Sequence, residues 1–194
     1  ADTIRTHALP LQPFYDLLAA FRQDVTQTRY ADFEELAEYC RRSANPVGRL
    51  LLRLVRCDSE ANIALSDAVC TGLQLTNFLQ DVGADYTRGR IYLPQDAMHA
   101  HGVTQDDIAA RRYSPGWQRL IDGEIGRARG LLLHGTRLGG HLPGRFALEI
   151  RLTIAGGLTI LDKLQARNRR RFITGTRLTP LDWLRVLWRS HGLR

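Results

Sequence analysis

The sequence predicts an all-α protein that forms a single domain. Apolar residues recur with helical periodicity along most of the chain, whereas strand signals are nearly absent because β-branched residues never alternate over the length of a strand. No repeat, low-complexity segment or long linker divides the chain, and 194 residues are enough for one domain with a substantial core. We therefore expect one all-α domain over residues 1–194.

Each expected helix rests on its apolar spacing and on the residues at its ends. The first, over residues 13–28, gathers on one face the apolar side chains Phe14, Leu17, Leu18, Phe21 and Val25. The second, over residues 32–43, begins at Asp32 as N-cap, with Glu35 three positions later. Further helices are expected from Pro46 and over residues 60–86, 115–138, 144–170 and 179–190. The loop "TRGRIYLP", which ends in a proline-started turn, follows the helix over 60–86. Gly139–Gly140 and "TGTRLTP" break the chain before the last two helices.

The net charge of +7 comes almost entirely from arginine, since Lys163 is the only lysine. Such a balance fits nucleic acid, anionic lipid or phosphorylated substrates, although a genomic bias toward arginine codons explains the ratio without any partner. The chain has no apolar run long enough to span a membrane and no signal-peptide layout. Cys40, Cys57 and Cys70 are scattered without metal-ligand spacing, which indicates buried thiols in a reducing cytosol.

The stretch "LTNFLQDVGADY" places Asn77, Asp81 and Asp85 on one stripe of an expected helix that is apolar around most of its circumference. No lysine or arginine occurs between residues 57 and 87, so the two carboxylates lack a cationic partner on their own helix. Buried carboxylates without a counter-charge are costly and repel each other. Oxygen ligands from two aspartates and an amide suit Mg²⁺. The alternative is an exposed polar stripe on an amphipathic helix.

Arg88 and Arg90 follow the acidic stripe by one helical turn or less. A guanidinium can clamp a phosphate with two parallel hydrogen bonds, so metal ligands followed by arginines indicate a diphosphate site. The alternative is that both arginines are salt-bridge partners of Asp81 and Asp85.

A second informative stretch, "YCRRSANPVGRLLLRL", contains Pro46, which would kink a continuous helix. The simpler local account ends one helix and begins another, with Asn45 as N-cap and Pro46 at the first helical position. Ser43 and Gly48 are small and leave room beside the break for a bulky substrate. Tyr39 lies one turn earlier and offers a hydroxyl and a π face that would attract a cation.

Three stretches together resemble the squalene/phytoene synthase family: "YCRRSANPVGRLLL", "GLQLTNFLQDVGADYTRGRIYLP" and "RLTIAGGLTILDKL". The resemblance covers essentially the whole chain. It implies an isoprenoid-synthase-type helical bundle around a central apolar cavity, Mg²⁺ held by two aspartate-rich motifs and a prenyl diphosphate substrate. We also expect a cytoplasmic enzyme that contacts the inner face of the cell membrane peripherally and has no nucleic-acid partner.

Within the family, "CRRSANPVG" and "NFLQDV" are most similar to the hydroxysqualene synthase (HpnC-type) branch of bacterial hopanoid biosynthesis. Sister branches typically show "VAG" in place of "SAN" and an arginine at the position of Gln80. The branch implies Mg²⁺-dependent conversion of presqualene diphosphate to hydroxysqualene with release of diphosphate. One alternative is a head-to-head prenyltransferase that makes presqualene diphosphate, squalene or phytoene-like products. Another is a non-enzymatic basic helical module that binds anionic lipid, to which "WLRVLWRSHGLR" contributes a partly basic amphipathic face.

The resemblance assigns roles to particular positions. Metal binding falls to Asn77, Asp81 and Asp85, diphosphate contact to Arg90, closure over the diphosphate to Arg171, and proximity to the cation to Tyr39. Arg88 is a further candidate for diphosphate contact because of its place after the acidic stripe. Gln80, Asn45 and Ser43 are candidates to hold the water that quenches the cation, because they are polar where the sister branches differ.

The first aspartate-rich motif of the family should precede "PFYDLL" and does not occur in this sequence. We therefore expect residues 1–194 to be the C-terminal two-thirds of the family domain, without its N-terminal helices. Apolar faces that those helices cover should then be exposed, and the chain alone should be inactive.

Overall fold

A computed structural model describes residues 2–168, 172 and 175–193. Its helices, in chain order, are α1 (Asp2–Thr6), α2 (Gln12–Thr26), α3 (Phe33–Ser43), α4 (Asn45–Leu54), α5 (Glu60–Thr87), α6 (Gln95–Ala100), α7 (Gln105–Ala109), α8 (Pro115–His134), the 3₁₀ turn η1 (Gly135–Arg137), α9 (Leu138–His141), α10 (Gly144–Asn168) and α11 (Pro180–Gly192). The described residues form no β-strand, so the all-α prediction is confirmed.

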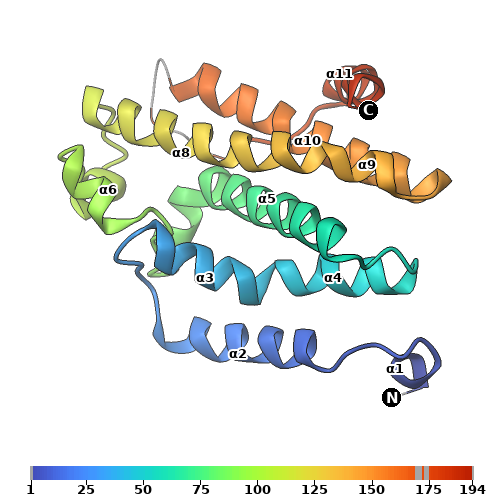
Figure 1. The fold of residues 1–194 in the computed structure, drawn as a ribbon. Coiled ribbons are helices and arrows are strands. Elements are labelled where there is room, and N and C mark those ends of the chain that lie inside the picture. The colour runs from blue at the N-terminus through green and yellow to red at the C-terminus, as the bar shows by residue number, and fades with distance from the viewer. Residues whose placement is uncertain (1, 169–171, 173–174, 194) are drawn as a thin grey trace.

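The helices stack in layers around α5, the longest of them. Figure 1 shows α8, α9 and α10 above α5, the α3–α4 pair below it, and α2 as the lowest layer. α5 packs mainly against α8 and also against α4 and α10. Its apolar side chains, such as Phe78 and Leu79, join Trp117, Ile121 and Leu158 in one buried cluster. Helix α5 is therefore buried over most of its circumference, as the sequence predicts.

The start of α3 follows from its capping residues. The Asp32 carboxylate accepts a hydrogen bond from the backbone N–H of Glu35 at 2.9 Å, which satisfies one of the free donors at the helix start. The Glu35 carboxylate accepts in turn from the backbone N–H of Ala31 at 2.5 Å. The predicted N-cap at Asp32 is thus confirmed.

Two sequence predictions about helix ends are wrong. Ala44, not Asn45, is the N-cap of α4, because the Asn45 side chain is buried and instead accepts a hydrogen bond from the Thr71 hydroxyl of α5 at 2.9 Å. The break predicted at Gly139–Gly140 also fails, because both glycines lie within α9 and the chain becomes extended only at Leu142. Of the three cysteines, all free, only Cys40 is buried, and the other two are half-buried.

Helix α2 packs on α3 and α4 through the side that carries Pro13, Asp16 and Ala20. The apolar residues beyond that contact remain open to solvent, so that Phe21 is 61% exposed and Val25 is 80% exposed. Exposed apolar surface is expected from the sequence, although the sequence does not assign it to this helix.

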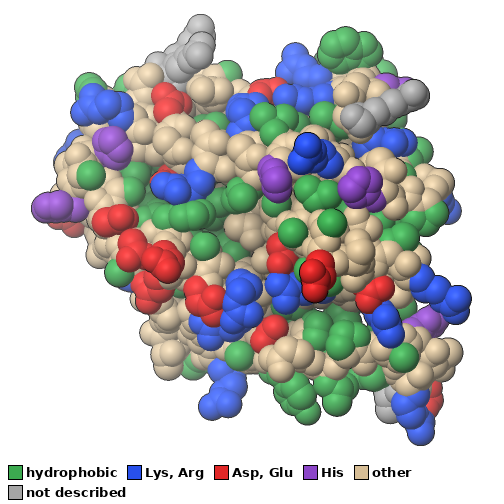
Figure 2. Space-filling model, viewed as in Figure 1, with side chains coloured by type: hydrophobic (Ala, Val, Ile, Leu, Met, Phe, Trp, Pro, Cys, Tyr) green, Lys and Arg blue, Asp and Glu red, His purple; other side chains and the backbone are tan. Residues whose placement is uncertain are grey.

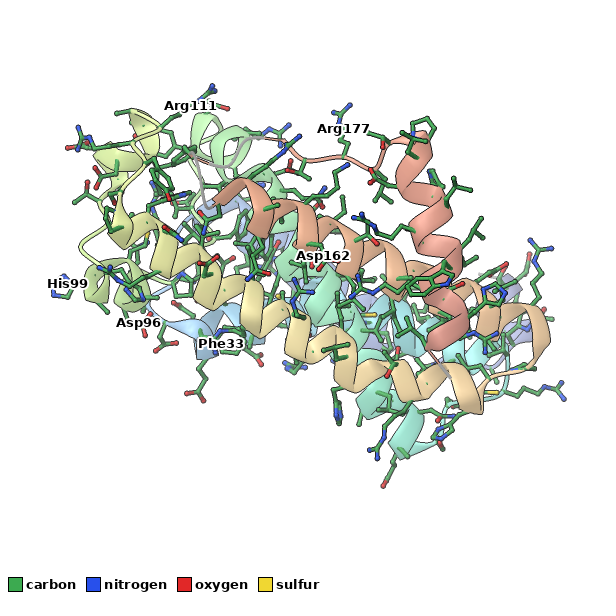
Figure 3. The ribbon with its side chains drawn as sticks, turned by 90° about the horizontal axis from the view of Figure 1, so that it is seen from above. Phe33, Asp96, His99, Arg111, Asp162 and Arg177 are labelled. Atoms are coloured by element: carbon green, nitrogen blue, oxygen red, sulfur yellow. The ribbon has the colours of Figure 1, made fainter. Side chains whose placement is uncertain are left out.

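Helix α11 is attached to the rest of the bundle by ion pairs. Asp162 of α10, labelled in Figure 3, accepts from Arg129 of α8 and from Arg189 of α11, each at 2.7 Å. Lys163 of α10 pairs with Asp182 near the start of α11. None of the helices in the described part of the chain has both the length and the apolarity required to cross a membrane.

Candidate diphosphate site

The acidic stripe lies near the C-terminal end of α5. Asn77 is exposed, Asp81 is half-buried and Asp85 is buried. Burial raises the pKa of the Asp85 carboxyl, and the neighbouring charge of Asp81 raises it further, whereas the nearby arginines act in the opposite direction. The protein therefore holds a carboxylate where its own charge is disfavoured, which is the condition that a bound cation relieves.

Arg88 is a weak partner for this carboxylate. Its guanidinium lies 3.6 Å from Asp85 Oδ1, and its side chain is 69% exposed. An exposed pair of this length contributes about 0–1 kcal/mol. The salt-bridge alternative therefore holds for Arg88 with Asp85, while no such pair links Arg88 or Arg90 to Asp81 among the described residues.

The donor set of the stripe fits Mg²⁺. The described residues contain no group of three or more His, Cys, Asp or Glu side chains arranged to hold a metal ion. Mg²⁺ is commonly bound through one or two carboxylates and completes its octahedron with water and substrate phosphates. Asp81 and Asp85, with the Asn77 amide, would hold it, and the raised pKa of Asp85 is consistent with a place for positive charge.

Arg90 is positioned by the loop that follows α5. The backbone N–H of Arg90 returns to the Asp85 carbonyl at 2.9 Å, across Gly89, whose φ of +79° is a conformation that favours glycine. The loop then pairs with the segment between α2 and α3, because the N–H of Ile91 donates to the Thr28 carbonyl at 3.0 Å and Arg29 donates to the Gly89 carbonyl at 2.6 Å. Arg90 is thereby held beside the carboxyl end of the acidic stripe.

The structure adds Asp24 and Tyr92, which the sequence analysis does not select. Arg90 Nη2 donates to the Asp24 backbone carbonyl at 3.1 Å, and the Tyr39 hydroxyl donates to the Asp24 carboxylate at 2.8 Å. A signal for Asp24 exists in the sequence, because it lies three residues after Phe21 on the otherwise apolar side of α2.

Tyr39 belongs to a buried aromatic cluster. Its ring centroid lies 5.4 Å from that of Tyr30, 6.0 Å from that of Tyr92 and 6.3 Å from that of Phe78. The Phe78 and Tyr92 rings stack with centroids 3.9 Å apart and planes 7° from parallel. Because Phe78 follows Asn77 directly, the cluster fixes the loop of Arg90 against the helix of the acidic stripe.

A hollow of about 650 Å³ lies between α5, α10 and α11. Its polar lining includes Thr76, Asn77 and Gln80, and apolar side chains such as Ile160 and Trp183 form much of the remainder. Gln80 Nε2 donates to the Thr176 backbone carbonyl at 2.5 Å, so this amide is held in place at the edge of the acidic stripe.

A smaller hollow of about 220 Å³ adjoins the first, because Leu73 and Thr153 line both. Gly48 lines it, but a Cβ on Gly48 would come 2.3 Å from Ser66 Oγ and 2.7 Å from Cys70 Sγ of α5. Gly48 therefore has a packing role, the close approach of α4 to α5, in addition to the lining role expected from the sequence.

The remaining predicted residues are placed as follows. The Ser43 hydroxyl is buried and has no hydrogen-bond partner within the described residues, whereas Asn45 is engaged with Thr71. Tyr39 does not line either hollow. Arg171 lies outside the described residues. The structure thus brings the acidic stripe, Gln80 and Arg90 to one end of α5, and leaves the α3–α4 junction beside the smaller hollow.

An all-α bundle with an acidic stripe, arginines and an adjoining apolar hollow defines a protein of the isoprenoid-synthase fold class. A family model described as squalene/phytoene synthase matches residues 1–188. The chain belongs to the squalene/phytoene synthase family, whose members are enzymes of isoprenoid biosynthesis. The family expected from the sequence is confirmed.

Two curated relatives carry the name hydroxysqualene synthase. The protein of Rhodopseudomonas palustris is 40% identical over 162 residues, which cover 82% of this chain and 55% of that protein. The protein of Sinorhizobium fredii is 35% identical over 180 residues, which cover 91% of this chain and 60% of that protein. The chain thus spans less than two thirds of the length of these relatives.

Solved structures give the same fold. The crystal structure of squalene synthase HpnC from Alicyclobacillus acidocaldarius superposes with a TM-score of 0.84 at 41% identity, over 88% of this chain and 65% of that chain. A dehydrosqualene synthase in complex with ligand superposes with a TM-score of 0.79 at 22% identity and shows a likeness of fold alone.

Proposed function

We propose that the protein converts presqualene diphosphate and water to hydroxysqualene and inorganic diphosphate, with Mg²⁺ as cofactor. The observation that carries this proposal is the 40% and 35% identity to two proteins named hydroxysqualene synthase. The acidic stripe beside Arg90 supports the diphosphate part of the reaction, and the mostly apolar hollow supports a hydrocarbon substrate.

In this proposal Asp81, Asp85 and Asn77 would hold Mg²⁺, which would supply positive charge to the leaving diphosphate. Arg90 contacts the diphosphate through its planar fork of donors, and Arg88, which is exposed, contacts it from the rim. The positive charges of the two arginines favour the breaking of the carbon–oxygen bond because they stabilise the negative charge that develops on the leaving group. The apolar lining of the hollow keeps bulk water from the carbocation.

Water must still reach the cation once. Gln80 is a polar group held at the wall of the larger hollow, and the buried Ser43 hydroxyl has no hydrogen-bond partner in the described part of the chain. A buried polar atom of this kind is a place where an ordered water binds. The Asn45 side chain, which accepts a hydrogen bond from Thr71, supports the α3–α4 junction that contains Ser43. The oxygen of the water bonds to the carbocation, and its proton leaves to solvent or to the released diphosphate. Tyr39 contributes through Asp24, as argued below.

A second candidate within the family is squalene formation, because the 41% identical structure is named a squalene synthase. The two are separated by supplying presqualene diphosphate with Mg²⁺, with and without NADPH as reductant, and identifying the products by mass spectrometry. Alcohol formed without reductant supports hydroxysqualene synthesis. Squalene formed only with reductant would support squalene formation instead. In a separate incubation with farnesyl diphosphate, a cyclopropyl diphosphate product would support a head-to-head prenyltransferase.

A non-enzymatic module that binds anionic lipid is the candidate from another class. Trp183 and Trp188 of α11 are 52% and 81% exposed, which suits a membrane interface. However, Figure 2 shows basic and acidic side chains interspersed on the face it displays, with no single basic patch. We therefore propose that the protein is a cytoplasmic enzyme that also contacts the membrane peripherally. We further propose that residues 1–194 form one domain. Mg²⁺-dependent diphosphate release distinguishes the enzyme from the module.

A further inference from the structure

Asp24 contacts both Tyr39 and Arg90. The Tyr39 hydroxyl donates to Asp24 Oδ1 at 2.8 Å, and Arg90 Nη2 donates to the Asp24 backbone carbonyl. The neighbouring Tyr92 and Asp24 both raise the pKa of Arg90. Residues of α2, α3 and the loop after α5 thus meet at Asp24.

The surroundings hold these residues in one arrangement. The Tyr39 and Tyr92 rings lie within the buried aromatic cluster, and Tyr92 stacks on Phe78 of α5. Burial and the hydrogen bond to Asp24 both raise the pKa of Tyr39, so its hydroxyl remains a donor. The Asp24 backbone carbonyl also accepts from Arg90 Nη2 at 3.1 Å. Asp24 therefore contacts Tyr39 through its carboxylate and Arg90 through its backbone carbonyl.

We propose that Asp24 is a positioning residue for the diphosphate-binding arginine. Its carboxylate accepts from the Tyr39 hydroxyl, which fixes the end of α2, and its backbone carbonyl then holds the Arg90 guanidinium in one orientation beside the acidic stripe. This inference rests on the proposed function only in that Arg90 contacts a diphosphate. It does not depend on which product is made.

A positioning role and a simple charge effect predict opposite results. A carboxylate near an anion site repels the anion, so its removal should tighten diphosphate binding if charge were its only influence. If Asp24 acts by orienting Arg90, its removal should weaken binding, because a loosened guanidinium loses the geometry of its fork. The sign of the change therefore separates the two accounts.

The test is isothermal titration of the full protein that carries this chain with inorganic pyrophosphate in the presence of Mg²⁺. Asp24→Ala should weaken binding by about tenfold, the effect of losing one hydrogen bond to a charged group. Asp24→Asn removes the charge but keeps an acceptor oxygen for Tyr39, so it should lose less. The control is Asp16→Asn, which changes a buried carboxylate of the same helix that accepts a hydrogen bond from Gln12, and this variant should bind as the parent does.

A double-mutant cycle with Arg90→Ala completes the test. In that background Asp24→Ala should cause no further loss, because the group it positions is gone. Unchanged or tighter binding by Asp24→Ala, or losses that simply add, would overturn the inference while leaving the proposed function intact. Failure of the parent to bind Mg²⁺ and pyrophosphate would overturn the diphosphate site itself, and this inference with it.

Discussion

Replacing Asp85 by Asn should stabilise the metal-free protein while removing its function. Asp85 is buried, and its pKa is raised by burial and by Asp81, so the ionised carboxylate is disfavoured in the folded state. Because the folded-state pKa lies above the unfolded one, the native protein loses stability as the pH rises from the usual aspartate range through the raised value. An asparagine has no such charge and avoids this loss.

The magnitude follows from the neighbours of Asp85. Removing a like-charge pair at i,i+4 spacing on a helix gains about 0.2–0.5 kcal/mol, and relief of charge burial adds to it. Loss of the long, exposed pair with Arg88 costs about 0–1 kcal/mol, here near the lower limit. We expect a net gain of about 0.5 kcal/mol, which corresponds to a rise in Tm of about 1–2 °C.

The assay is urea unfolding of parent and variant at neutral pH in EDTA, repeated at acidic pH, where the gain should disappear. The control is Asp67→Asn on the same helix. Asp67 accepts two hydrogen bonds from Arg49 at 2.6 and 3.0 Å, so this variant should lose about 1 kcal/mol. Destabilisation by Asp85→Asn at neutral pH without metal would refute the reasoning, since it would show that the protein itself compensates the charge.

Three further predictions concern the site and the packing that supports it. Asp81→Asn in the full protein should abolish turnover and leave the helical circular dichroism intact; near-normal turnover would exclude it as a metal ligand. Arg90→Lys should lower kcat/KM by nearly as much as Arg90→Ala does, because lysine offers a point charge and no planar fork of donors. If the Arg90→Lys variant is as active as the parent, Arg90 is only a charge partner. Gly48→Ala should lower the unfolding free energy by about 1–3 kcal/mol because its Cβ would come 2.3 Å from Ser66 Oγ. Gly123→Ala, whose new Cβ would have no atom of the described residues within 4 Å, should instead be neutral or stabilising by up to about 1 kcal/mol, and equal effects of the two would contradict the packing argument.

Features set by local sequence are the ones that the sequence predicts well. The N-cap at Asp32 requires only residues within one turn, and its hydrogen bond is present. The long helix of Asp81 and Asp85 follows from its apolar periodicity, and its burial follows from its composition. The stripe of polar residues on that helix is therefore predictable, although its bound metal stays a prediction.

Features set by distant partners are the ones that sequence reasoning misses. Asn45 reads locally as a helix cap, but Thr71, 26 residues away, takes its side chain. Asp24 becomes notable only when Tyr39 and Arg90, 15 and 66 residues away, are brought to it by the fold. Gly139 reads as a break, yet it lies in α9 with Arg151 so close that a Cβ would come within 2.7 Å of it. Tertiary packing overrides local propensity at each of these positions.

The most direct test of the proposed chemistry is the origin of the product oxygen. The full protein is incubated with presqualene diphosphate and Mg²⁺ in ¹⁸O-labelled water, and the product is analysed by mass spectrometry. Capture of a carbocation by water predicts hydroxysqualene that carries the label, with release of diphosphate. Unlabelled alcohol, or a hydrocarbon in place of the alcohol, would contradict the account.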